Sequence, residues 1–464
     1  MSRHVYLQTY GCQMNERDSE EILGMLTAQG YTVVPREEEA DVVLLNTCSV
    51  RAHAEERAFG KMAAVQRLKQ TRPELVLGIL GCMAKAQREE IFRRLPQVDL
   101  VAGPAEIYDL PDLLARVAEQ RQGALTPAGA QLLAIQRQVR PLDRKPAGDY
   151  RSRPATAFVT IMEGCDKKCA YCIVPMTRGQ EVSRPLAEIL EELQHLARAG
   201  YRQVTLLGQN VNSYGKRFPD GSGYQGPGLR RRLLDQQPDA VVDFPALLRA
   251  IDAKTAIERV RFTTSHPFDA HEELFRAMAD CRSVCEYLHL PVQSGSDRVL
   301  RAMRRGYTVE SYRAKVARLR ELIPDVALST DIIVGFPGET DEDFEATAAL
   351  MAAIEFDSAF LFKYSPRPGT EAARASDDVP RAVKEARHQT LLARQERISR
   401  GKLERWIGRE VDLLVEERNR RGQLAGHTRT NVNVVCDGPD GLIGELVGVR
   451  VERATPTTLI GSLV

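Results

Sequence analysis

The segment Met162–Pro175, with the sequence MEGCDKKCAYCIVP, guides the interpretation of the whole chain because it places three cysteines on one short stretch. Cys165, Cys169 and Cys172 follow the spacing CxxxCxxC, and no fourth cysteine or histidine lies close by in DKKCAYCIVPMTRG. A structural zinc site would need four such ligands. A [4Fe–4S] cluster held by three thiolates instead keeps one iron free for an outside ligand. We therefore predict such a cluster, with zinc or a chance spacing as the alternatives.

The cysteine segment directly follows the first of several apolar, strand-like runs. These runs alternate with helical patterns such as PLAEILEELQHLARAG, which is typical of an open or complete α/β barrel. Active sites of such barrels lie on the loops that follow the strands, and the three cysteines stand on such a loop. We assign residues 154–385 to this central domain. The strand-like runs are TAFVTIM, QVTLLG, RVRFTT, EYLHLP, ALSTDIIVGF and SAFLFKYS.

Residues 1–120 show a similar alternation and form a separate predicted domain. The apolar segments VYLQTY, DVVLLN, ELVLGIL and VDLVAG alternate with helical patterns such as SEEILGMLTAQG and QREEIFRRL. This order predicts βα units around an open, mostly parallel sheet. Residues 121–153 then become polar and contain prolines, which predicts a linker.

Three more cysteines stand at equivalent places in this first domain. Cys12, Cys48 and Cys82 follow predicted strands in TYGC, LNTC and ILGC. Open α/β sheets bind ligands beyond the carboxyl ends of their strands, so loops from neighbouring strands would bring these three sulfurs together. The alternative is that each is a buried free cysteine, which is a common fate of this residue type. The repeated placement favours a second metal-binding triad.

Residues 386–464 form the last predicted region. An amphipathic helix around KEARHQTLLARQERISRGKLERW is followed by the short alternating runs VDLLVEE, NVNVV and GVRVERA. Gly, Asn and Asp separate these runs, which is typical of a small all-β module.

The composition is that of a folded protein. Hydrophobic residues make up 43% and charged residues 27% of the 464 residues, which excludes a disordered chain or a coiled coil. The formal net charge of +1 means that a nucleic-acid partner would have to be attracted by a local basic patch. Nine cysteines cannot all pair in disulfides. The sequence contains neither a secretory signal nor ~18 continuous apolar residues, so we expect a cytoplasmic protein without a membrane partner.

Taken together, these motifs resemble the radical S-adenosylmethionine (SAM) enzymes, and within them the methylthiotransferases, closest to the tRNA-modifying MiaB group. The resemblance covers nearly the whole chain. It implies that Cys165, Cys169 and Cys172 hold the catalytic cluster, whose free iron chelates the amino and carboxylate groups of SAM. It also implies that the first-domain cysteines hold an auxiliary cluster, which makes two [4Fe–4S] clusters and SAM the expected cofactors.

The resemblance further implies a set of SAM-binding residues. Tyr171, before the last cysteine, would lie by the adenine. Gly208 and Gln209 in LLGQN would lie near the amino group of SAM, and Asp331 and Gly335 in STDIIVGFPGET beside its ribose and adenine. Glycine and aspartate at strand ends are also common turn formers, so this alternative stays open.

The tail resembles a TRAM domain, a small RNA-binding β-barrel. Its segment ERNRRGQLAGHTRTNVNVV gathers basic side chains suited to phosphate contacts, while the alternative is a solvated turn. The candidate RNA-binding residues are Arg418, Arg420, Arg421, Arg429 and Asn431.

The family resemblance implies methylthiolation of the isopentenylated adenosine beside the anticodon of tRNA, with SAM as methyl donor and radical source. The expected partners are the tRNA anticodon stem-loop and an electron donor such as a flavodoxin, and we expect a monomer. The alternatives are methylthiolation of a ribosomal-protein aspartate or of a threonylcarbamoyl-adenosine in tRNA, and a non-catalytic RNA-binding iron–sulfur sensor.

Three further cysteines and two histidines are interpreted as structural residues, and one insert has no assigned role. Cys281, Cys285 and Cys436 are expected to be buried thiols. His266 and His289 follow strand-like runs, yet a lone histidine is more often a hydrogen-bonded structural residue. The Gly-, Pro- and Arg-rich insert at 215–245 is longer than the family resemblance implies.

Overall fold

The computed structural model describes residues 3–49, 52–123, 131–138, 140, 150–236 and 241–464. These residues form two compact units. The first unit comprises Met1–Ser152, Glu163–Lys167 and Cys172–Val182, and the second comprises Arg153–Met162, Lys168–Tyr171 and Ser183–Val464.

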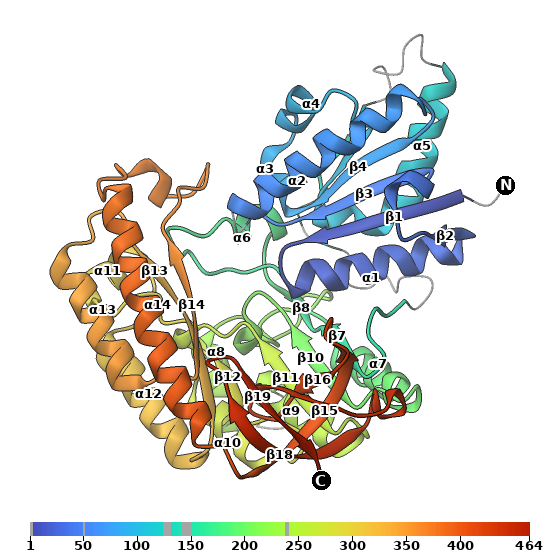
Figure 1. Ribbon diagram of the computed structural model, residues 1–464. Coiled ribbons are helices and arrows are strands. Elements are labelled where there is room, and N and C mark those ends of the chain that lie inside the picture. Colours follow the sequence, from blue (N-terminus) through green and yellow to red (C-terminus); the bar gives the residue numbers. More distant parts are fainter. Residues whose placement is uncertain (1–2, 50–51, 124–130, 139, 141–149, 237–240) are drawn as a thin grey trace. The chain divides into compact units, whose positions relative to one another are not determined.

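The first unit is built on a six-stranded parallel sheet with the order β2-β1-β3-β4-β5-β6 (Figure 1). The strands are β1 (Arg3–Tyr10), β2 (Tyr31–Val33), β3 (Val42–Thr47), β4 (Val76–Gly81), β5 (Leu100–Ala102) and β6 (Leu132–Ala134). The helices are α1 (Gln13–Ala28), α2 (Ala52–Val65), α3 (Cys82–Gln87), α4 (Glu90–Arg94), α5 (Leu110–Gly123) and α6 (Val174–Arg178).

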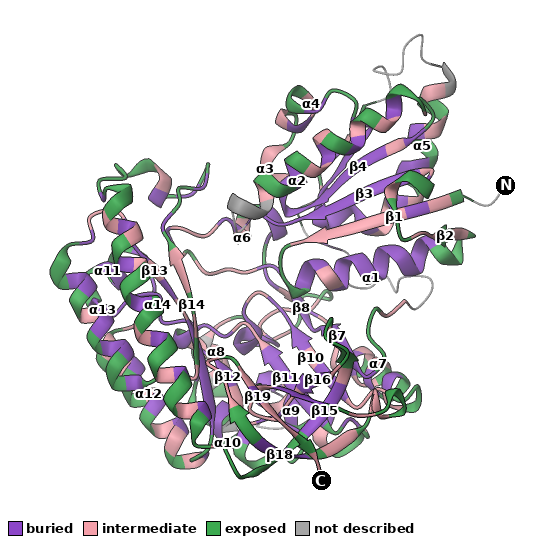
Figure 2. Ribbon diagram, viewed as in Figure 1, coloured by how far each residue is buried: buried purple, intermediate pink, exposed green. Residues whose placement is uncertain are grey.

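Alternate residues of β3 pack on opposite faces of this sheet. Leu44 lies in a core cluster with Ile22 of α1 and Leu113 of α5. Val43 packs in a second cluster with Met62 of α2. β3 is buried along its whole length, as Figure 2 shows, because helices cover both faces of the sheet. The continuous apolar run DVVLLN reflects this double burial.

Part of the segment predicted as a linker belongs to this unit. β6 lies within residues 121–153 and pairs in parallel with β5, with Leu132 opposite Leu100. Arg140, from the same segment, is buried. The run LLA is too short to stand out as a strand in a polar sequence. Residues 124–130, 139 and 141–149 of the predicted linker lie outside the described residues.

The second unit contains two three-stranded parallel sheets, ordered β11-β10-β7 and β12-β13-β14. An isolated parallel bridge between Val260 and Val284 connects β11 to the segment that leads into β12. Neighbouring strands follow the chain order and helices follow the strands, which is the arrangement of an open (β/α) barrel. The strands are β7 (Thr156–Thr160), β10 (Gln203–Leu207), β11 (Arg259–Thr263), β12 (Tyr287–His289), β13 (Ala327–Val334) and β14 (Ser358–Lys363).

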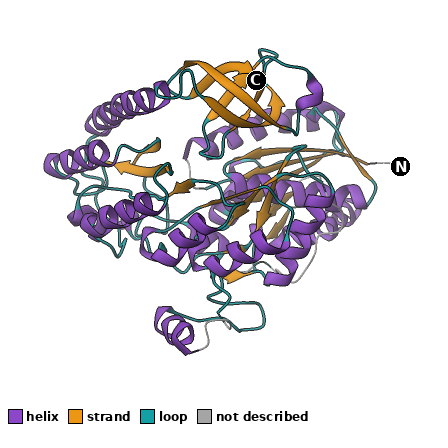
Figure 3. Cartoon of the chain, turned by 90° about the horizontal axis from the view of Figure 1, so that it is seen from below, coloured by secondary structure: helices purple, strands orange, loops and turns teal. Residues whose placement is uncertain are grey.

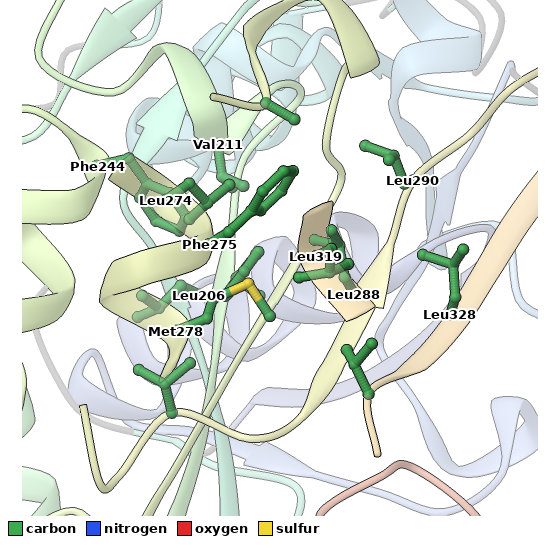
Figure 4. Close-up of a cluster of buried hydrophobic side chains, with 14 of the residues drawn as sticks. Leu206, Val211, Phe244, Leu274, Phe275, Met278, Leu288, Leu290, Leu319 and Leu328 are labelled. Atoms are coloured by element: carbon green, nitrogen blue, oxygen red, sulfur yellow. The ribbon is translucent and has the colours of Figure 1, made fainter. Parts of the chain in front are cut away.

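Helices pack on these strands through one large apolar core. Figure 4 shows Leu206 of β10 and Leu288 of β12 among side chains from the surrounding helices, including Phe275 and Leu319. The helices are α7 (Leu186–Arg198), α8 (Pro227–Gln236), α9 (Phe244–Lys254), α10 (Glu272–Asp280), α11 (Asp297–Ala302), α12 (Val309–Leu322), α13 (Asp341–Ile354) and α14 (Arg381–Glu404). A short pair, β8 (Met162–Glu163) and β9 (Val182–Ser183), flanks the cysteine segment.

The chain ends in a closed five-stranded barrel with the order β15-β16-β17-β19-β18, seen beside the C-terminus in Figure 3. Cys436 is fully buried in its core, and Cys281 and Cys285 are buried in the open barrel, as expected for structural thiols. The predicted fold class, an open sheet followed by a partial barrel and a small β-barrel, is confirmed. The strands are β15 (Glu410–Arg418), β16 (Leu424–His427), β17 (Asn433–Cys436), β18 (Leu446–Ala454) and β19 (Thr458–Leu463).

The insert at 215–245 is anchored where it joins the open barrel. The Tyr224 hydroxyl donates to the Ser213 carbonyl at 3.0 Å. Arg230 of α8 pairs with Asp243 at 2.6 Å, and Asp243 also accepts the Ala246 amide as the N-cap of α9. Residues 237–240 lie outside the described part of the chain. No helix in the described ranges combines the length and apolar character needed to cross a bilayer.

Candidate active site with two cysteine triads

Cys12, Cys48 and Cys82 follow three neighbouring strands that end at the same level. In the sheet, Tyr10 of β1 pairs with Thr47 of β3, and Thr47 pairs with Gly81 of β4. Each cysteine comes one or two residues after these paired positions. The structure therefore brings together the first-domain cysteines at one sheet edge, as the sequence predicts.

Gly11 allows the first two of these cysteines to lie close together. Its φ of +141° is a conformation that other residues rarely adopt, and a Cβ atom on Gly11 would lie 2.4 Å from the Cβ of Cys48. The glycine before Cys12 is thus required by this close approach.

The thiols of Cys12 and Cys82 have different electrostatic surroundings. A hydrogen bond from Cys48, together with the nearby Arg178, lowers the pKa of the exposed Cys12 thiol to about 6. Burial raises the pKa of the Cys82 thiol, and the positive charge of Arg178 opposes this effect. Thiolates are the form that binds metals, so of these two residues Cys12 has the surroundings that favour metal binding.

The arrangement and the donor type of the two triads bear on which kind of metal centre they could hold. Among the residues that the structure describes, no group of three or more His, Cys, Asp or Glu side chains is arranged to hold a metal ion. In a [4Fe–4S] cluster each cysteine binds a different iron, so its ligands surround the whole cluster rather than a single ion. The all-cysteine donor sets of both triads suit such a cluster.

The second triad lies on the loop between β8 and α6. The Cys165 amide donates to the Gly179 carbonyl at 3.1 Å, which ties the start of the loop to the end of α6. Gly164, just before this cysteine, has a φ of +75°, and a Cβ atom there would lie 2.0 Å from the Gln180 carbonyl oxygen. Only glycine fits at this position without moving the loop.

Two buried residues that the sequence did not assign to the site contact Cys169. The Arg305 guanidinium donates to the Cys169 sulfur at 3.3 Å, and the His266 Nε2 lies 3.7 Å from the same atom. Arg305 is itself fixed by bonds to the Pro291 carbonyl at 2.8 Å and the Tyr307 hydroxyl at 3.0 Å. The histidine after β11 therefore lies beside the cluster loop, where the sequence alone favoured a structural role.

Polar side chains without partners gather at the carboxyl ends of the open-barrel strands. Thr160, Gln209, Asn212, Ser265 and Gln293 all have buried side-chain atoms that make no hydrogen bond within the described residues. They stand at or just after β7, β10, β11 and β12. An unmet buried polar atom costs about 1–3 kcal/mol, so such a group points to a polar ligand. The amino, carboxylate, ribose and adenine groups of SAM fit this donor and acceptor set.

The other predicted SAM contacts differ in their surroundings. Tyr171, which is part of the cluster loop, packs beside Met303 and Phe336. The Asp331 carboxylate, on β13, lies 3.5 Å from the Nε2 atom of His289, on β12. The Gly335 amide donates to Glu339 at 2.9 Å and its φ is +69°, which supports the turn-forming alternative for this residue. Gly208 packs closely on the barrel interior, where an added Cβ atom would lie 2.4 Å from Met162 Cγ.

The candidate RNA-binding residues fall into two groups. Arg429 pairs with Glu286 of the open barrel at 2.8 Å, and Asn431 lies near the Tyr287 hydroxyl of β12. Arg418 donates to the Gly438 carbonyl at 2.9 Å within the small barrel. Arg420 and Arg421 are exposed and form no ion pair with described residues, which leaves them accessible to phosphate.

Buried arginines of β11 hold the small barrel against the open barrel. Arg259 donates to the His427 carbonyl at 2.8 Å and pairs with Asp412 at 2.6 Å. Arg261 donates to the Arg429 carbonyl at 3.1 Å. The sequence RVRFTT gave no signal of this role, because its arginines alternate with apolar residues as solvent-facing strand residues do.

Family models match three parts of the chain in this order. The model described as "Uncharacterized protein family UPF0004" matches residues 4–103, "Radical SAM superfamily" matches residues 159–351, and "TRAM domain" matches residues 404–464. The matches agree with the open sheet, the open barrel and the closed terminal barrel.

Solved structures with a similar fold include two radical SAM enzymes. The methyltransferase TsrM from Kitasatospora setae is 16% identical, with a TM-score of 0.54 over 80% of this chain and 77% of that one. OxsB is 14% identical, with a TM-score of 0.52 over 86% of this chain and 56% of that one. At these identities the likeness concerns the fold alone.

Relatives of much higher identity extend over the whole chain. A protein from Symbiobacterium thermophilum is 43% identical over 99% of this chain and 94% of its own length. One from Anoxybacillus flavithermus is 44% identical over 100% of this chain and 83% of its own length. Both are named tRNA-2-methylthio-N(6)-dimethylallyladenosine synthase. This identity runs through both cysteine-bearing domains and the TRAM domain, and the chain therefore belongs to the family of radical SAM tRNA methylthiotransferases that these synthases represent.

Proposed function

We propose that this chain methylthiolates the isopentenylated adenosine beside the anticodon of tRNA, with SAM as both methyl donor and radical source. Two separate cysteine triads are the observation that carries this proposal, one at the carboxyl ends of three parallel strands and the other on the loop between β8 and α6. Replacing an unactivated aromatic C–H bond by C–S offers no acidic proton to a side-chain base, so the reaction needs cofactor chemistry.

In this proposal Cys165, Cys169 and Cys172 hold the [4Fe–4S] cluster that binds SAM. When bound, the cofactors supply a 5′-deoxyadenosyl radical at this site and a methylated sulfur at the auxiliary cluster held by the other triad. Arg305 fixes the Cys169 sulfur and adds a permanent positive charge beside it. The unpartnered Gln209 and Gln293 side chains orient SAM by hydrogen bonding, so that its reacting bond has one defined position.

The target base must leave its stack to reach the open barrel. An adenosine next to the anticodon lies in a single-stranded loop, where unstacking costs little. Exposed Arg420 and Arg421 would contact the flanking phosphates. We further propose that a small electron-transfer protein such as a flavodoxin reduces the cluster, and that the enzyme acts as a cytoplasmic monomer.

The substrate assignment predicts a methylthio mass gain confined to isopentenylated adenosine. Reconstituted enzyme, SAM and reductant are incubated with isopentenylated and unmodified tRNA in parallel, and digested nucleosides are analysed by mass spectrometry. A threonylcarbamoyl-adenosine tRNA and ribosomal proteins serve as competing substrates. A gain found only on one of these competitors would contradict the assignment, and an absence of SAM cleavage under all conditions would favour a non-catalytic sensor.

The two groups of tail arginines predict separable effects on RNA binding and stability. Replacing Arg420 and Arg421 together by alanine should weaken tRNA binding and lower its salt slope by about 2, because two phosphate contacts are lost. Arg429→Ala should leave that slope unchanged but destabilise the fold by about 1 kcal/mol, since Glu286 loses its partner. Filter binding over a salt series measures the salt slope, and thermal melts measure the stability of each variant. A reversed pattern would show that Arg429 contacts RNA.

A further inference from the structure

Arg178, at the end of α6, connects the chain around the second triad to the thiols of the first. It lies six residues after Cys172 in the sequence PMTRG, yet its side chain is only 3% exposed. α6 packs against α3, which begins with Cys82. The positive charge of the Arg178 guanidinium lies close enough to Cys82 and Cys12 to influence both thiols.

Two buried carboxylates fix this guanidinium. Arg178 pairs with Asp18 of α1 at 2.7 Å and with Glu163 of β8 at 3.1 Å. Arg140 closes the arrangement, because it pairs with the same two carboxylates at 2.8 Å each. Burial would raise the pKa of Asp18, but the two arginines lower it, so this carboxylate stays charged.

A guanidinium held in this way cannot turn away from Cys82 without leaving two carboxylates unpaired in the interior. Such a loss is costly for buried ion pairs. The planar arginine side chain has enough donors to serve both carboxylates at once, and it stays charged while it does so. Arg140 offers a natural comparison, since its strongest electrostatic partners are Glu21, Tyr108 and the two shared carboxylates rather than a cysteine.

We propose that Arg178 is a positioning residue for the auxiliary triad, and that the positive charge of its clamped guanidinium, held beside the helix that begins at Cys82, raises the reduction potential of the cluster. This inference rests on the proposed function, because it takes Cys12, Cys48 and Cys82 as cluster ligands. Hydrogen bonds to the sulfurs and net local charge both set the potential of iron–sulfur clusters. Reduction adds negative charge, so a fixed cation beside one ligand favours the reduced state.

The test uses the full chain with Cys165, Cys169 and Cys172 replaced by alanine, so that only the auxiliary cluster contributes a signal. Iron content and an EPR-monitored redox titration are measured for this parent and for three added changes. Arg178→Gln should shift the midpoint potential to a more negative value. Arg178→Lys keeps the positive charge, so its midpoint potential should lie between those of Arg178→Gln and the parent. Arg140→Gln leaves the same two carboxylates short of a cation, but no cysteine is among the strongest electrostatic partners of Arg140, so it should shift the potential less than Arg178→Gln does.

A parent-like potential in Arg178→Gln, or an equal shift in Arg140→Gln, would overturn the role of Arg178. If Arg178→Gln assembles no cluster, the double change Asp18→Asn with Arg178→Gln removes both charges. That variant should bind iron with a potential below the parent's, and a parent-like value would again contradict the proposal. Absence of iron from the parent itself would instead overturn the cluster assignment on which the proposed function depends.

Discussion

Replacing Cys169 by alanine should eliminate 5′-deoxyadenosine formation from SAM, whereas replacing Cys48 should preserve that reaction and eliminate the methylthiolated nucleoside. Cys169 lies on the cluster loop beside Arg305 and His266, next to the unpartnered polar groups that suit SAM. Cys48 lies at the edge of the other parallel sheet, among the auxiliary thiols. Both products are measured by mass spectrometry after incubation with reductant and isopentenylated tRNA, and each loss should reach background.

Cys281→Ala is the matched control for these two variants. Its thiol is buried in the core of the open barrel, and burial raises its pKa to about 11, so it is a poor metal ligand. This variant should form both products at near the parent rate. Methylthiolated product from Cys48→Ala at the parent rate would remove the basis for an auxiliary cluster.

Gly164→Ala should cost the protein one of its two clusters, so that iron after anaerobic reconstitution falls from ~8 to ~4 atoms per chain. The new methyl group would lie 2.0 Å from the Gln180 carbonyl oxygen, and the loop that carries Cys165 would have to move. Positive φ alone adds about 1–2 kcal/mol for a residue with a Cβ atom. Iron analysis and the SAM-cleavage assay measure the result.

Gly200→Ala separates the steric clash from the backbone cost. Gly200 also has a positive φ, +92°, but a Cβ atom there would meet nothing within 4 Å. The Gly200→Ala variant should therefore be slightly less stable than the parent and should retain both clusters. Full iron content in the Gly164 variant would mean that the loop tolerates the displacement, and the geometric requirement described for Cys165 would be wrong.

The sequence predicts the fold and the cysteine triads for the same physical reason. Apolar runs mark parallel strands, and parallel strands deliver the residues that follow them to one edge of a sheet. Cys12, Cys48 and Cys82 could be grouped in this way although they are far apart in the chain. The second triad needed only local spacing, since Cys165, Cys169 and Cys172 share one loop.

Contacts between charged residues distant in sequence could not be predicted in this way. Arg178 looks like a surface charge in PMTRG, and its partner Asp18 is 160 residues away. Arg140, which completes the buried arrangement, comes from a segment whose composition indicates a linker. Likewise, a run of arginines in the tail does not reveal that Arg429 faces Glu286 while Arg420 faces solvent. The hydrophobic pattern of a sequence describes one helix or strand at a time. These ion pairs depend on how several helices, strands and loops pack together.

The arginines of β11 limit how domains of this family can be recombined. A chimaera that joins this open barrel to a foreign terminal barrel must supply backbone carbonyls where His427 and Arg429 now accept from Arg259 and Arg261. Without them, both guanidinium groups would be enclosed at the junction with some of their N–H donors unpaired. Exchange at the boundary near residue 404 therefore transfers a functional module only when the donor also matches this face of the open barrel.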